Sequence, residues 1–177
     1  MRIPNDIRKA VVFLGHKGPS KDDAFIPIGT GFFLMHEYET YLVTARHIAE
    51  QIGDDPYHIR LNHTDGRALN CYCDPLEFAQ QGARWSFHED PNVDVAVMPF
   101  RFYIERAGAD FLILQSSLAP DRGTQAVECG DFCYVIGLFG LHPGKDRMMP
   151  VIHTGHIAMM SDPNERIPTQ DWRNKKV

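Results

Sequence analysis

The 177-residue sequence lacks any long hydrophobic run, and no stretch approaches the roughly 18 apolar residues that a membrane-spanning helix needs. The apolar stretch 10–14 is shorter than the hydrophobic part of a secretory signal. Positive charge is not in excess, because 18 Lys and Arg residues stand against 23 Asp and Glu, a formal net charge of −5. A weakly acidic chain has no general attraction for nucleic acid or anionic membranes. We therefore expect no nucleic acid and no membrane among its partners.

Cysteine is scarce, and the chain contains only Cys71, Cys73, Cys129 and Cys133. Cys71 and Cys73 are too close in sequence for an ordinary disulfide. The spacings C-x-C and C-x-x-x-C are not those of a usual zinc ribbon. We therefore predict four reduced thiols in a cytoplasmic protein, with no metal and no cofactor.

What the sequence does contain is a succession of short β-type segments between turn residues. Its 14 Gly and 12 Pro residues favour turns over long helices. Tyr57, Ile59 and Leu61 alternate with polar residues and are expected to share one face of a strand. The pattern predicts an all-β protein with one short helix over 46–52, ended by Gly53. The expected strands are 11–14, 29–35, 40–44, 57–61, 68–73, 85–88, 94–98, 132–136 and 151–160.

Two residues in this pattern suit acid–base chemistry. His47 directly follows the strand 40–44 and begins the helix, so a rigid element would hold its imidazole as a general base requires. Asp94 heads the apolar strand 94–98, where a carboxylate is costly to desolvate unless it accepts hydrogen bonds, and an imidazole N–H is a natural donor. Taken singly, each has a plainer interpretation: a histidine packed at a helix start, and an aspartate solvated in a turn.

Several segments follow one another in a fixed order over roughly residues 10–160: Gly29-Thr30-Gly31-Phe32, Thr44-Ala45-Arg46-His47, Asp94-Val95-Ala96-Val97 and the two later strand segments 130–137 and 150–158. Together they resemble the chymotrypsin-like (trypsin-fold) serine peptidases, and in particular their cytosolic, disulfide-free bacterial branch.

The resemblance implies a chymotrypsin-like double antiparallel β-barrel. Residues 1–105 would form a complete first barrel, 106–130 a connector, and 131–177 the opening strands of an incomplete second barrel. It also implies a trypsin-like serine endopeptidase that hydrolyses peptides or proteins by acyl transfer. His47 would be the general base, and Asp94 would orient its ring and stabilise the imidazolium.

The third member of such a triad is missing from the sequence. The family places its nucleophilic serine in a G-x-S-G motif, and none occurs here. Ser161 has no flanking glycine, Ser116 and Ser117 lie in the expected connector, and Cys129 and Cys133 flank a strand that the family buries. We expect the chain to be C-terminally incomplete and to have negligible peptidase activity alone. The missing segment or another chain would cover the open second barrel.

Two other functions fit parts of the sequence. A non-catalytic module could keep the barrel and hold a peptide or partner protein by strand addition. A metal-dependent hydrolase could use the histidines, but His153 and His156 would point to opposite faces of a strand and could not chelate together. The glycine-rich stretch 137–144 lacks the phosphate-binding pattern.

Overall fold

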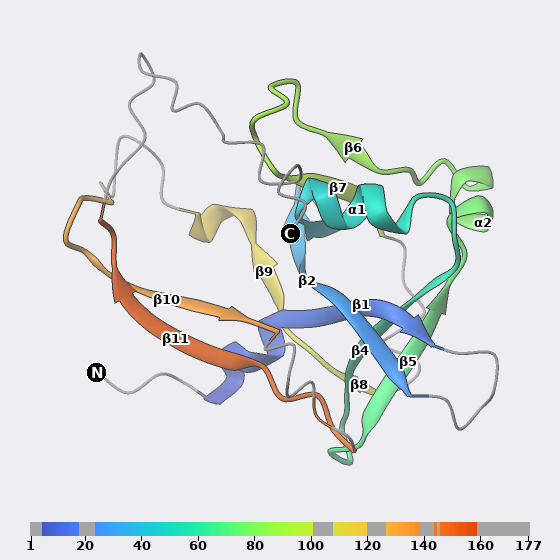
Figure 1. Ribbon diagram of the computed structural model, residues 1–177, viewed down its shortest axis with the longest axis horizontal. Coiled ribbons are helices and arrows are strands. Elements are labelled where there is room, and N and C mark those ends of the chain that lie inside the picture. Colours follow the sequence, from blue (N-terminus) through green and yellow to red (C-terminus); the bar gives the residue numbers. More distant parts are fainter. Residues whose placement is uncertain are drawn as a thin grey trace, which may run out of the picture.

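The computed structural model describes residues 5–17, 24–100, 108–119, 127–138, 144 and 146–158. Most of this structure is antiparallel β-sheet with a few short helices, which confirms the predicted all-β class. A larger sheet and a two-stranded sheet lie on different sides of the molecule (Figure 1).

The larger sheet contains β1 (Val11–Lys17), β2 (Phe25–His36), β3 (Glu39–Thr44), β4 (Tyr57–His63), β5 (Ala68–Cys73), β6 (Ser86–Phe87), β7 (Ala96–Pro99), β8 (Ala109–Asp110) and β9 (Ile113–Gln115). The smaller sheet contains β10 (Phe132–Gly137) and β11 (Val151–His156). The helical elements described are η1 (Asn5–Ala10), α1 (Arg46–Ile52), α2 (Pro75–Gln80) and η3 (Ser116–Leu118).

The strands of the larger sheet follow the order β5-β4-β1-β2-β3-β7-β6, with all neighbours antiparallel. Two further strands join it outside this path: β8 pairs with β4, and β9 pairs in parallel with β2. The segment expected to be a connector therefore contributes β8 and β9 to this sheet. Within the described residues no ladder joins β5 to β6, so the sheet is not closed there, and a complete first barrel stays a prediction.

The main core lies against the larger sheet and follows the alternation of its strands. Tyr57, Ile59 and Leu61 are all buried, as the period-two pattern predicts. Phe33 of β2 is fully buried, and its ring lies 5.4 Å from that of Phe100. Helix α1 covers part of this core with three buried side chains, those of Ile48, Ala49 and Ile52.

Helix α1 ends where the sequence predicts. Gly53 has a φ of +55°, which lies in the left-handed region that favours glycine, and its N–H bonds to the carbonyl of Ala49. The first residues after β3 thus form a short, rigid helix on the sheet, and this helix carries His47.

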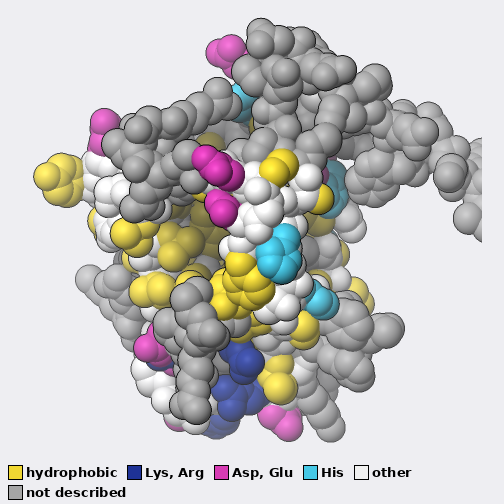
Figure 2. Space-filling view, turned by 90° about the vertical axis from the view of Figure 1, so that its left-hand side faces the viewer, with side chains coloured by type: hydrophobic (Ala, Val, Ile, Leu, Met, Phe, Trp, Pro, Cys, Tyr) yellow, Lys and Arg dark blue, Asp and Glu magenta, His cyan; other side chains and the backbone are white. Residues whose placement is uncertain are grey.

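The two-stranded sheet is attached to the larger sheet through side-chain amide and hydroxyl groups. The N–H of Leu138, just after β10, donates to Thr30 Oγ1 at 2.8 Å. Asn62 of β4 makes a reciprocal pair with the backbone of Met148, at 3.1 and 2.7 Å. No residue of β10 or β11 is buried, and Val135 is 63% exposed. Figure 2 views the molecule from this side and shows hydrophobic and histidine side chains at the surface.

Candidate active site

The antiparallel pairing of β3 and β7 brings His47 and Asp94 together. Thr44, the last residue of β3, lies opposite Ala96, the first residue of β7. His47 comes three residues after Thr44, and Asp94 comes two residues before Ala96. Because the two strands run in opposite directions, these positions meet at the same end of the ladder. Residues 47 positions apart in sequence are therefore neighbours in space.

Asp94 makes two hydrogen bonds to His47, one with each carboxylate oxygen. Its Oδ2 lies 2.6 Å from Nδ1 of the imidazole. Its Oδ1 accepts the backbone N–H of His47 at 2.9 Å. An ionised carboxylate can only accept hydrogen bonds, so Nδ1 carries the proton in this pair and Nε2 is the nitrogen that can take up another. The side chains are 37% and 48% exposed, so solutes can reach the pair.

The bond to the backbone also explains how α1 begins. Ala45 occupies the N-cap position and has no side-chain oxygen to accept a backbone N–H of the first turn. Asp94 supplies that acceptor from the segment that leads into β7. The same carboxylate therefore fixes both the start of the helix and the plane of the His47 ring.

The glycine-containing segment that precedes the site has a packing role. A Cβ placed on Gly29 would lie 2.8 Å from side-chain atoms of Ile48, so only glycine lets α1 approach β2 this closely. Thr44 Oγ1 donates to the carbonyl of Thr30 at 2.9 Å and ties the end of β3 to β2. These contacts hold the end of β3 and the helix α1, which carries His47, against β2.

Arg46 joins α1 to β6, a contact that sequence reasoning missed. Its Nε donates to Glu50 at 2.8 Å, and its guanidinium carbon lies 5.0 Å from the centre of the Phe87 ring. The i,i+4 spacing of Arg46 and Glu50 is a visible signal for the ion pair. Nothing in the sequence indicates the stacking on Phe87, because it depends on how β6 folds back beside α1.

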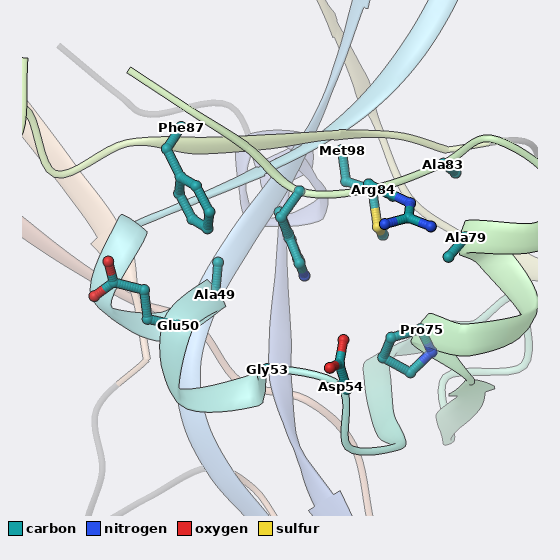
Figure 3. A pocket seen from close by; sticks show the side chains of 11 residues that line it. Ala49, Glu50, Gly53, Asp54, Pro75, Ala79, Ala83, Arg84, Phe87 and Met98 are labelled. Carbon is teal, nitrogen blue, oxygen red and sulfur yellow. The ribbon is translucent and has the colours of Figure 1, made fainter. Parts of the chain in front are cut away.

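A cavity of about 240 Å³ lies beside the C-terminal end of α1 (Figure 3). Asp54 and Arg84 lie on opposite sides of it, and Ala49 and Met98 contribute apolar surface. Neither His47 nor Asp94 lines this cavity. The cavity therefore lies next to helix α1, but it does not reach the His47 imidazole.

The other sequence candidates lie apart from this pair or outside the described residues. The Ser116 hydroxyl is 3.0 Å from the His36 ring, and Ser117 is exposed beside it. His153 and His156 sit opposite Val135 and Phe132 in the β10–β11 ladder, on alternate faces as predicted. The described part of the chain contains no cluster of metal-ligating side chains. Ser161 lies outside the described residues.

All four cysteines are free thiols, and burial makes two of them poor nucleophiles. Burial raises the pKa of Cys71 to about 11 and that of Cys73 to about 12, from a usual value of 9.0. The thiolate is the reactive form, so neither thiol is activated near neutral pH.

These raised pKa values predict a loss of stability at alkaline pH. The stabilising effect is fully present below about pH 9, where both states keep their thiols protonated, and is lost as the pH rises because only the unfolded thiols ionise. We expect the free energy of unfolding, measured by urea titration, to fall between pH 9 and pH 11. The free energy of unfolding should fall less steeply with pH in Cys71→Ala than in the parent chain. In Cys129→Ala, the control at an exposed cysteine, it should fall as steeply as in the parent chain. Equal slopes in all three proteins would contradict the prediction.

None of the described helices is long and apolar enough to cross a membrane.

Comparison with protein-family models and with curated proteins finds no match to this chain. A proposal about its function therefore has to be argued from the geometry of the His47–Asp94 pair.

Proposed function

We propose that the protein is a hydrolase of the chymotrypsin-like serine peptidase type, with His47 as general base and Asp94 as the group that orients it. The observation that carries this proposal is the pair of hydrogen bonds that Asp94 accepts from the ring and the backbone of His47, at 2.6 and 2.9 Å. A carboxylate held on Nδ1 fixes the tautomer in which Nε2 accepts a proton, as a serine nucleophile requires.

In the proposed reaction, Nε2 of His47 takes the proton of the attacking hydroxyl as the oxygen–acyl bond forms. The resulting imidazolium is stabilised by Asp94 and returns the proton to the leaving amine. Partial exposure of the pair gives a peptide or protein substrate access to it. This chemistry uses no cofactor.

The nucleophile of this reaction lies, we infer, outside the described residues. Ser116 lies beside His36, at the opposite end of the β2–β3 hairpin from His47. Ser86 lies in β6 opposite Val97, and the chain has no G-x-S-G motif. The proposal includes the chymotrypsin-like double barrel, in which the larger sheet would belong to the first barrel and β10 and β11 would open the second. It also includes a cytoplasmic location.

The test begins with the coding sequence beyond the codon for Val177. We expect the frame to continue into a G-x-S-G motif, and we expect the longer product to hydrolyse peptides. In that product, His47→Ala should lower kcat by about 10⁴-fold or more. The serine, histidine and aspartate of a triad act together, so loss of the base disables all three. His153→Ala, on the exposed strand β11, is the matched control and should leave kcat unchanged. Equal activity of the His47→Ala variant and the parent protein would rule out the proposal.

A second candidate function is a module that binds a peptide or partner protein by strand addition. The two-stranded sheet favours it, because β10 and β11 are unburied and carry apolar side chains such as Phe132 and Val135 at the surface. If this function is correct, peptide binding will persist when His47 is replaced by alanine.

A further inference from the structure

A second cluster of complementary side chains lies at the other end of the β2–β3 hairpin. The Ser116 hydroxyl is 3.0 Å from Nδ1 of His36. The other ring nitrogen of His36, Nε2, is 3.9 Å from a carboxylate oxygen of Glu37. A hydroxyl, an imidazole and a carboxylate thus follow one another in the order in which a nucleophile, its base and an orienting group act.

The parallel pairing of β2 and β9 fixes the contact between His36 and Ser116. Met35 lies opposite Gln115 in this ladder, at the ends of the described pairing. His36 is the next residue of β2, and Ser116 follows β9 directly as the first residue of η3, so the parallel pairing brings the two residues side by side. The serine–histidine contact is therefore set by strand register and not by the chance meeting of two long side chains.

The turn that follows His36 has an uncommon backbone. Glu37 and Tyr38 both have positive φ values, +46° and +69°. Hairpin turns of this kind favour Asn and Gly, because other side chains are disfavoured in the left-handed region. Ordinary residues held in such a conformation are often found where a side chain has a task, and here the turn brings the Glu37 carboxylate close to Nε2 of His36.

We propose that Ser116 is a nucleophilic serine, activated by His36, that reacts with activated acyl donors such as aryl esters. As the bond between Ser116 Oγ and the acyl carbon forms, the bond from that carbon to the aryl oxygen breaks. The hydroxyl proton passes to Nδ1 of His36, and the aryl oxide leaves with the bonding electrons. Glu37, beside Nε2, stabilises the imidazolium that results.

Aryl esters are the appropriate donor class for this cluster. Their leaving group departs as a stabilised phenolate, so the reaction depends mainly on the nucleophile and its base. Amide bonds require in addition donors that stabilise the acyl oxyanion. The Ser116 site is therefore an acylation site, distinct in chemistry from the peptidase reaction proposed for His47. It is also distinct in place, because Thr44, which leads to His47, pairs with Gly31, whereas His36 pairs with Glu39.

The test is acetylation of the 177-residue chain by p-nitrophenyl acetate, followed by peptide mass spectrometry. We expect Ser116 to be acetylated at least about tenfold faster than its exposed neighbour Ser117, which serves as the internal control. A positioned general base contributes about 10²–10⁴-fold, so His36→Gln should lower the rate at Ser116 by about 10²-fold. Glutamine can still hydrogen-bond the hydroxyl but cannot take its proton, which separates a base from a merely structural partner.

The remaining outcomes are equally decisive. Equal acetylation of Ser116 in the parent chain and in His36→Gln would overturn the proposal, as would acetylation of Ser116 no faster than of Ser117. Ser117→Ala should leave the rate at Ser116 unchanged, and Glu37→Gln should lower it by less than His36→Gln does. His47→Ala should not change it, so failure of the peptidase proposal and failure of this one are distinguishable.

Discussion

Replacing Asp94 with Asn is expected to lower kcat of the proposed peptidase by about 10⁴-fold, the size of effect that this change has in the Ser-His-Asp triad of chymotrypsin-like peptidases. Asparagine keeps an oxygen for the backbone N–H of His47 but places its amide nitrogen where Oδ2 lies 2.6 Å from Nδ1. An amide NH₂ group only donates, so Nδ1 must accept and the imidazole proton moves to Nε2. Nε2 can then no longer take a proton from an attacking hydroxyl.

The Asp94 prediction can be measured on two forms of the protein. In the longer product, kcat should fall while the unfolding midpoint stays nearly constant, because both hydrogen bonds to His47 keep a partner. In the 177-residue chain, proton NMR should show a low-field N–H signal from the short bond between Nδ1 and Oδ2, and Asp94→Asn should abolish it.

Asp90→Asn is the matched control for this prediction. Asp90 precedes Asp94 in the same segment and also accepts a backbone N–H, that of Asn92 at 2.9 Å. Its amide variant should keep both the low-field signal and the activity. Unchanged turnover in Asp94→Asn would show that this carboxylate does not orient a catalytic base, and its bond to the backbone of His47 would then serve only to start helix α1.

The sequence was sufficient to predict the strands that bury one face and the helix that carries His47. Tyr57, Ile59 and Leu61 show a clear period of two, and Gly53 marks the end of the helix. The prediction that His47 and Asp94 lie together depended on the resemblance. No local sequence pattern shows which two segments, 47 residues apart, become neighbours in the fold. The structure adds the reason for their contact, which is the register between β3 and β7.

Other elements carried too little pattern to be predicted. Helix α2 has an N-cap at Asp74 and a proline at its start, but it buries none of its six residues and so shows no hydrophobic stripe. Strands β8 and β9, of two and three residues, are shorter than a period-two signal requires. Strand β2 begins earlier than expected, and Pro27 is tolerated within it because it lies opposite Gly15, where the register with β1 shifts.

Phe33→Ala should have the largest effect on stability, a loss of about 3–5 kcal/mol in the free energy of unfolding. Phe33 is fully buried, with its ring 5.4 Å from Phe100 and 5.5 Å from Phe111. Its strand is paired on both sides at this position, with Leu42 of β3 and Ile113 of β9. Two ladders hold the backbone, so the structure can close little of the cavity and the loss should be near the upper end of this range.

Phe132→Ala is the comparison that isolates burial, since Phe132 also lies on a strand but is half exposed. Urea titration should show that Phe132→Ala lowers the free energy of unfolding by about 1 kcal/mol, because roughly half of the apolar surface of Phe132 already faces water. Equal costs for the two variants would mean that the larger sheet does not contain the dominant core. At urea concentrations below its unfolding midpoint, the Phe33→Ala variant should still show the low-field N–H signal of His47. The bonds from Asp94 are local to the end of the β3–β7 ladder, so the pair can keep its geometry while the core beneath it is weakened.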